Sequence, residues 1–199
     1  MKRCILDWET LGVRQDSIVL SVGVLVYDEE ETHTWESLKD KGLYIKFNIE
    51  EQKKMGRIVQ KSTIDWWKNQ AKNNKEALKV LKPDARHDTS LKELPKLLNR
   101  YFEQEGYNGY KNKLYTRGQF DYLILQSIYE DNLKEKLPIP FWNVRDIRTL
   151  IDTLTFGERG KVPGFEVHPE TVLHHALDDC KNDLLQIQAA WQFGQDDEE

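Results

Sequence analysis

Cysteine is scarce in this 199-residue chain, which has only Cys4 and Cys180. No C-x-x-C pair occurs, so the sequence offers neither a disulfide framework nor a cysteine zinc site, and both thiols are expected to be buried. Long apolar runs are also missing, because no uninterrupted stretch approaches the roughly 18 residues that a membrane span needs. The first residues meet a charge at Asp7, too early for a secretory signal. These absences favour a reducing, cytoplasmic setting without a membrane.

The composition is that of a folded protein with an uneven charge distribution. Hydrophobic residues make up 39% of the chain and aromatics 11%, more than a disordered chain carries. The net charge is −5, yet residues 51–100 hold 13 Lys and Arg against 6 Asp and Glu, and residues 151–199 hold 11 acids against three bases. This segregation suits a protein that binds a polyanion in one place and metal cations in another. The alternative is that the lysines are solvated faces of surface helices.

The pattern of apolar residues predicts a mixed α/β order. Strands are expected at residues 5–6, 17–27, 43–47, 113–116 and 139–144. Capping boxes at Ser62 and Ser90 predict helix starts, and further helices are expected at 119–131, 146–154 and 175–193, the last ending at Gly194. Residues 157–169 are expected to form a loop. We expect one domain over residues 1–195, with a five-stranded mixed sheet, its first three strands antiparallel, flanked by helices, and a disordered acidic tail at 196–199.

Two groups of carboxylates follow predicted strands. Asp7 and Glu9 are two residues apart in an extended segment, so both side chains point to one side, where they would repel without a cation. Asp121 follows the fourth strand at the start of a helix, where the helix dipole favours an anion. Taken singly, a D-x-E pair is common surface decoration and Asp121 is an ordinary N-terminal helix acid.

A third group opens the last predicted helix. His174 and His175 precede Asp178 and Asp179 at spacings of three to five residues. Helical i,i+4 geometry allows simple salt bridges here, but histidine also titrates near neutrality and can act as a base. A zinc site is the rival interpretation. It is poorly supported, because an oxygen-rich set of ligands suits hard cations such as Mg²⁺ or Mn²⁺.

The joint order of these groups resembles the DEDDh family of ribonuclease H-like 3′–5′ exonucleases. The His174-to-Asp179 spacing matches the histidine subclass, although His175 and Asp178 remain alternatives for the base and the ligand. Within the family the chain is similar to the exonuclease A group of T-even phages and related bacterial exoribonuclease-like proteins. Five segments carry this resemblance: 6–10, 61–70, 117–121, 141–149 and 179–183.

The resemblance implies the ribonuclease H-like fold and a two-metal active site. Asp7, Glu9, Asp121 and Asp179 would hold two divalent cations, Mg²⁺ or Mn²⁺, and His174 would be the general base. The implied reaction is stepwise hydrolysis from a 3′ end to nucleoside 5′-monophosphates. The alternative from another class is a nucleic-acid-binding or polymerase-partner module that keeps the fold without catalysis.

The resemblance also implies a substrate-binding surface. The expected partner is a single-stranded nucleic acid with a free 3′ end, with DNA favoured and RNA open, and a homodimer is compatible because related enzymes often pair. If the protein is phage-encoded, the expected location is the host cytoplasm. The residues expected to contact substrate are Thr10, Leu11, Trp66, Trp67, Gln70, Phe120, Arg145 and Arg148. Adjacent tryptophans face different sides of a helix, so at least one of Trp66 and Trp67 is expected in the core.

Overall fold

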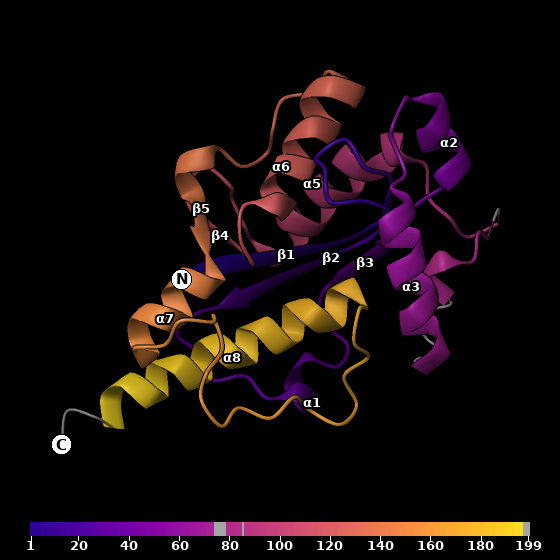
Figure 1. Ribbon diagram of the computed structural model, residues 1–199. Coiled ribbons are helices and arrows are strands. Elements are labelled where there is room, and N and C mark those ends of the chain that lie inside the picture. Colours follow the sequence, from indigo (N-terminus) through magenta and orange to yellow (C-terminus); the bar gives the residue numbers. More distant parts are fainter. Residues whose placement is uncertain (74–78, 85, 197–199) are drawn as a thin grey trace.

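A five-stranded mixed sheet forms the centre of the molecule in the computed structural model, which describes residues 1–73, 79–84 and 86–196 (Figure 1). The strands are β1 (Lys2–Thr10), β2 (Val19–Asp28), β3 (Leu43–Lys46), β4 (Lys113–Thr116) and β5 (Val144–Asp146). Their spatial order is β3-β2-β1-β4-β5. The first three strands pair antiparallel, whereas β4 and β5 run parallel to β1. This arrangement confirms the predicted fold class.

Helices cover both faces and one end of the sheet. The α-helices are α1 (Trp35–Leu38), α2 (Ile49–Lys54), α3 (Lys61–Asn73), α5 (Leu94–Glu105), α6 (Phe120–Gln126), α7 (Ile147–Thr155) and α8 (Ala176–Asp196). Short 3-10 turns occur at Leu91–Glu93 and Phe141–Asn143, and a π-helical segment, Ser127–Leu133, continues α6. No helix of the described residues is long and apolar enough to cross a bilayer.

The alternation of side chains along β1 decides which groups face which helices. Cys4, Leu6 and Trp8 are buried in one core with residues of α5 and α6. Ile5 points to the opposite face and packs in a second core with residues of α7 and α8. Because successive strand side chains alternate, Asp7 falls on the α8 side together with Ile5. The strand therefore places its carboxylates opposite α8.

A third, smaller core closes the end of the sheet where β1 stops. Trp67 of α3 is 1% exposed and packs with Leu11, Ile18 and Leu20. Its indole N–H donates a hydrogen bond of 2.8 Å to the Thr10 carbonyl. The helix is thus fixed directly beside the last residues of β1.

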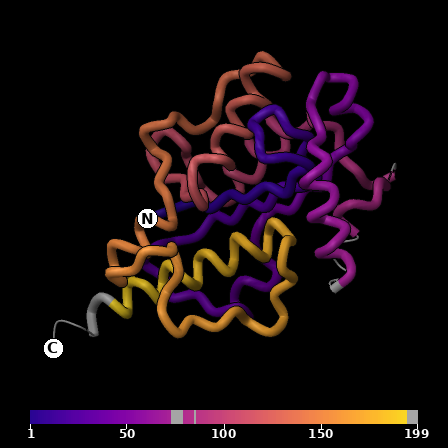
Figure 2. Tube along the Cα trace, in the orientation of Figure 1, coloured from indigo at the N-terminus to yellow at the C-terminus, as the bar shows by residue number. Residues whose placement is uncertain are grey.

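The segment between α7 and α8, residues 156–175, is a long loop that passes alongside α8 and returns to its first turn (Figure 2). The His168 ring stacks on Trp35 of α1, with 5.1 Å between centroids. Lys39 lies 3.1 Å from Glu170 in an ion pair. These contacts hold the loop, which is longer than the predicted 157–169.

Several predicted boundaries were wrong. Residues 139–140 are not in a strand, and β5 begins only at Val144, because the Pro140 that precedes the 3-10 turn lacks a backbone N–H. Ser62 lies inside α3 and is not its cap, since the helix already begins at Lys61. Helix α8 continues through Gly194 to Asp196. Residues 197–199 of the expected tail lie outside the described residues.

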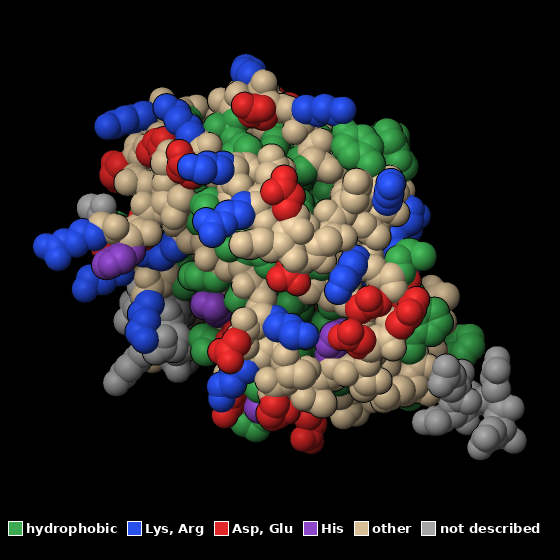
Figure 3. Space-filling view, turned by 180° about the vertical axis from the view of Figure 1, so that it is seen from behind, with side chains coloured by type: hydrophobic (Ala, Val, Ile, Leu, Met, Phe, Trp, Pro, Cys, Tyr) green, Lys and Arg blue, Asp and Glu red, His purple; other side chains and the backbone are tan. Residues whose placement is uncertain are grey.

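The positive segment 51–100 is spread over several helices. Lys53, Lys68 and Lys96 each lie within 4 Å of an acid three residues earlier in the chain. Seen from behind, Lys and Arg side chains alternate with Asp and Glu across the surface (Figure 3). These three lysines thus belong to solvated helix faces, the alternative noted from the sequence.

Candidate active site

The first turn of α8 lies directly on the middle of β2. A Cβ built on Gly23 would be 2.3 Å from the Ala176 carbonyl oxygen, closer than real side-chain atoms approach. Only glycine therefore permits this contact. Gly23 pairs with Asp7 across the β1–β2 ladder, and the Cys180 thiol donates to the Gly23 carbonyl at 3.4 Å. The helix is thus brought against the part of the sheet that carries Asp7.

Asp121 reaches the same place from the other side of β1. It lies in the first turn of α6, directly after β4, and is 5% exposed. The backbone N–H of Trp8 donates to Asp121 Oδ1 at 3.2 Å, and the Trp8 indole N–H donates to the Asp121 carbonyl at 3.1 Å. Trp8 stands between Asp7 and Glu9, so its two hydrogen bonds fix Asp121 beside both carboxylates.

The four predicted carboxylates form one electrostatically coupled cluster. Burial raises the pKa of Asp7 well above its usual value, and the charges of Asp121, Glu9 and Asp179 add to the rise. Burial also raises the pKa of Asp121 to about 7 and that of Asp179 to about 7. At neutral pH such groups hold protons that carboxylates normally release. The structure therefore brings together the residues that the sequence singled out.

Contact between two carboxyl groups shows how closely the acids lie. The pKa of Glu9 is raised well above its usual value by burial, by the charges of Asp179 and Asp121, and by a hydrogen bond with the Asp179 carboxyl. Such a bond requires a proton on one partner. A bound cation would replace that proton, and carboxylate oxygens are the ligands that hard divalent ions prefer. The donor set thus fits divalent metal ions.

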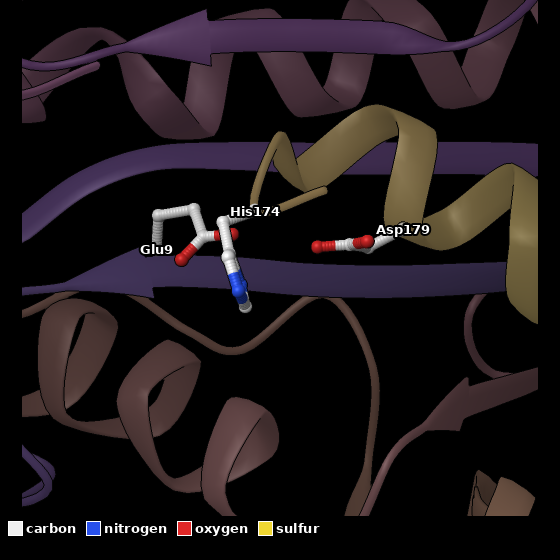
Figure 4. A group of neighbouring side chains, drawn as sticks. All are labelled: Glu9, His174 and Asp179. Carbon is white, nitrogen blue, oxygen red and sulfur yellow. The ribbon is translucent and has the colours of Figure 1, made fainter. Parts of the chain in front are cut away.

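His174 completes the cluster from the loop before α8. One ligand atom each of Glu9, His174 and Asp179 lies within 4.8 Å of the others, and Figure 4 shows the three side chains converging from β1, the loop and α8. The backbone of His174 is left-handed, with φ of 63°. The ring meets Trp66 edge-to-face at 4.8 Å between centroids. Burial lowers the pKa of His174 and so favours its neutral form.

The neighbouring His175 and Asp178 have other partners. The His175 ring stacks on Tyr44 with 4.2 Å between centroids. Asp178 Oδ2 accepts a hydrogen bond from the Val172 N–H at 3.1 Å, and its Oδ1 lies 3.8 Å from Lys181 Nζ. Of the two adjacent pairs, His174 and Asp179 are therefore the ones that face Glu9.

Asp183 and Arg117 also belong to the cluster, and sequence reasoning gave them no role. Asp183 is one helical turn after Asp179 and 5% exposed, and its charge raises the pKa of Asp7, Asp121 and Asp179. Arg117 Nη2 lies 2.5 Å from Asp183 Oδ1. The i,i+4 spacing from Asp179 could have indicated Asp183. No local pattern indicates its pairing with Arg117, 66 residues away.

The residues expected to bind substrate are dispersed around the cluster. Thr10 and Leu11 are buried at the end of β1, and Trp66 is 40% exposed whereas its neighbour Trp67 is in the core. Gln70 is partly buried on α3, and Phe120 is partly buried next to Asp121. The Arg145 guanidinium donates to the carbonyls of Trp142 and Val144 near β5. Arg148, by contrast, lines the same groove as the acids.

That groove has a volume of about 470 Å³ and is lined at one side by Asp7, Asp179 and His174. A larger cavity of about 870 Å³ lies at the β3 edge, around Lys46 and Asp88, but none of the clustered acids lines it. Size alone is therefore a poor guide here, and the chemistry points to the smaller groove.

Comparison with known proteins agrees with this site. Residues 2–191 match the family described as the 3′–5′ exoribonuclease Rv2179c-like domain. An exodeoxyribonuclease of Enterobacteria phage T4 is 31% identical over 212 residues, covering 95% of this chain and 88% of that protein.

Solved structures show the same fold at low identity. The nuclease domain of 3′hExo, a DEDDh family member bound to rAMP, has a TM-score of 0.60 at 17% identity, covering 98% of this chain and 92% of that chain. Cell-death related nuclease 4 has a TM-score of 0.60 at 15% identity, covering 94% of this chain and 62% of that chain.

The fold is the one seen in a DEDDh nuclease, and the family match together with the phage relative defines a 3′–5′ exonuclease, which confirms the resemblance seen in the sequence. Glu9 and Asp179, with His174 beside them, form a group that could hold a metal ion. The chain belongs to the Rv2179c-like 3′–5′ exoribonuclease domain family and is a 3′–5′ exonuclease acting on nucleic acid.

Proposed function

We propose that this exonuclease releases nucleoside 5′-monophosphates one at a time from the free 3′ end of single-stranded nucleic acid, with DNA favoured over RNA. The observation that carries the proposal is the convergence of Asp7, Glu9, Asp121 and Asp179 beside His174. The preference for DNA is supported by the relative from phage T4, which is named an exodeoxyribonuclease. The family description names an exoribonuclease, so RNA is the comparison substrate.

The four carboxylates would hold two divalent cations, Mg²⁺ or Mn²⁺. Bound there, such ions would supply Lewis acidity, lowering the pKa of a water molecule and stabilising negative charge on the departing 3′ oxygen. The chain's own contribution is a set of oxygen ligands fixed from three elements, β1, α6 and α8. The Trp8 N–H fixes Asp121 of α6 beside β1, and Gly23 allows α8 to lie close against the sheet.

His174 is proposed as the general base. A neutral imidazole nitrogen accepts the proton from the water that attacks the scissile phosphorus. Burial lowers the pKa of His174, so the ring is neutral and ready to accept a proton at physiological pH. The edge-to-face contact with Trp66 restricts the ring's orientation.

Substrate contacts follow from the positions of the remaining residues. Thr10, Leu11 and Phe120 border the carboxylates of β1 and α6 and are proposed to contact the terminal nucleotide. The open face of Trp66 is proposed to stack on a base, because aromatic platforms suit single strands. Trp67 acts through the core by holding the Thr10 carbonyl.

Degradation of end-labelled strands tests this function. A 5′-labelled single strand in Mg²⁺ or Mn²⁺ should yield a ladder shortened from the 3′ end, with nucleoside 5′-monophosphates as products. Matched DNA and RNA strands, single- and double-stranded, should show the fastest loss for single-stranded DNA. Internal cuts, or no product with either metal, would contradict the proposal. Asp7→Asn provides the inactive control.

A further inference from the structure

Besides Arg117, three cations line the groove alongside the carboxylates. Arg148 comes from α7, and Arg159 and Lys161 come from the 156–175 loop. We call these three residues the cationic cluster. Within the part of the chain that the structure describes, none of the three forms an ion pair within 4 Å. Cationic side chains that line one groove without a direct ion pair favour the binding of an anion there.

The loop that carries two of these cations is fixed at Gly160. The Gly160 N–H donates to Asp152 Oδ1 of α7 at 2.6 Å, and its carbonyl accepts from Arg117 Nη1 at 2.8 Å. A Cβ built at this position would lie 2.5 Å from Arg148 Cγ, and φ is +61°. Glycine therefore lets the loop cross directly over Arg148. The residues on either side of it, Arg159 and Lys161, are held in place by the same anchor.

Among the described residues, no carboxylate of the site forms an ion pair with the cationic cluster. Asp183 is paired with Arg117, whose three nitrogens all donate to Asp183 or to the Gly160 carbonyl. Arg148 is near enough to stabilise the charged forms of Asp121 and Asp183, yet it contacts neither. The three guanidinium nitrogens of Arg117 thus all donate to groups within the protein. The cationic cluster, by contrast, lines the groove.

We propose that Arg148, Arg159 and Lys161 bind the phosphate one nucleotide to the 5′ side of the scissile phosphodiester. This inference rests on the proposed function, because a free 3′ end leaves no phosphate on the 3′ side of the terminal nucleotide. Any second phosphate in the groove is therefore the next one upstream. Guanidinium and ammonium groups both form charge-assisted hydrogen bonds with phosphate oxygens.

A neutral linkage tests this subsite. Two short DNA strands with the same labelled 3′-terminal nucleotide are compared, one of them carrying a methylphosphonate at the linkage next to the scissile one. The wild-type enzyme should release the label from the methylphosphonate strand about tenfold more slowly in kcat/KM, since a hydrogen bond to a charged group is lost. A methylphosphonate placed several nucleotides further upstream should have little effect.

The variant Arg159→Gln/Lys161→Gln should lose this discrimination, so that the ratio of kcat/KM for the two strands falls close to one. Both residues are exposed, so the variant should fold, which its melting temperature checks. The matched control is Lys96→Gln/Arg100→Gln, which removes the same two charges from the exposed surface of α5 and should keep the wild-type ratio.

Two results would overturn the subsite: a wild-type enzyme that does not discriminate between the strands, or a variant that retains the wild-type ratio. Failure of the proposed function looks different. In that case the wild-type enzyme releases no label from the unmodified strand in Mg²⁺ or Mn²⁺, so the ratio of kcat/KM for the two strands cannot be measured.

Discussion

Gly23 of β2 lies against the Ala176 carbonyl of α8, and a methyl group at Gly23 would sit 2.3 Å from that oxygen. This contact sets the distance between the strand that carries Asp7 and Glu9 and the helix that carries Asp179. The site therefore depends on a residue that has no functional group. The geometry of the carboxylates is set by how closely two backbones approach.

Gly23→Ala should separate α8 from the sheet. We expect the free energy of unfolding to fall by about 1–3 kcal/mol, as for other overpacked sites. Urea denaturation with and without Mg²⁺ measures this, and the stabilisation by Mg²⁺ should shrink as well. If the variant gains as much from Mg²⁺ as the wild-type protein, the contact does not control the metal site.

Removing one carboxylate of the cluster should stabilise the metal-free protein while abolishing turnover. In Asp179→Asn the mutual repulsion with Glu9 and Asp183 is relieved, and a gain on the order of 1 kcal/mol or more is expected. Thermal unfolding in chelator gives the stability, and label release gives the activity. Asp65→Asn, at an exposed position on α3, is the control and should change both little. Loss of stability in Asp179→Asn would contradict the account.

The metal-free protein should become less stable as the pH rises from about 4 to above 7. Asp121 and Asp179 have pKa values of about 7 in the folded chain, so between their ordinary values and pH 7 the folded state binds more protons than the unfolded state. The free energy of unfolding then decreases with pH. Urea midpoints at several pH values in chelator test this, and saturating Mg²⁺ should reduce the slope. A midpoint that rises over this interval in chelator would be the opposite result.

The two adjacent histidines should differ in their effect on rate. His174→Ala should lower kcat by about 10²–10⁴-fold, the usual contribution of a general base, and should remove the rise of rate with pH. His175→Ala should retain that rise, because its ring stacks on Tyr44, whereas His174 is the histidine grouped with Glu9 and Asp179. Profiles of rate against pH for both variants distinguish them. If only His175→Ala loses the rise of rate with pH, then His175 and not His174 is the general base.

Much of the fold could be predicted from apolar periodicity. Strand β4 was predicted with its observed limits, residues 113–116, because four residues between turns leave little choice. The start of β5 was misplaced, since the apolar side chains of Phe141 and Trp142 suggested burial but are 72% and 57% exposed. The α6 helix passes into a π-helical segment, Ser127–Leu133. There the side chains of Asn132 and Ser127 accept hydrogen bonds from the buried Arg57 guanidinium. This contact joins residues far apart in sequence, so no local sequence pattern predicts it.

The carboxylates were predictable because Asp7 and Glu9 share one side of an extended segment, now seen inside β1, whereas Asp121 and Asp179 lie in the first turns of helices. Asp7, Glu9, Asp121 and Asp179 come together from three distant segments in the expected order. The Arg117–Asp183 pair and the close approach at Gly23 were not predicted, because both depend on packing between elements far apart in sequence. Which of Trp66 and Trp67 is buried depends likewise on where α3 rests on the sheet.

Titration of the metal-free protein with Mn²⁺, followed by electron paramagnetic resonance of the free ion, tests the central claim most directly. The account holds that bound divalent cations neutralise the negative charge of the clustered carboxylates. About two Mn²⁺ ions should therefore bind per wild-type chain. Binding should weaken sharply in Asp7→Asn, which keeps the shape of the side chain and removes its charge. A chain that binds no Mn²⁺, or an Asp7→Asn variant that binds as the wild type does, would contradict the account.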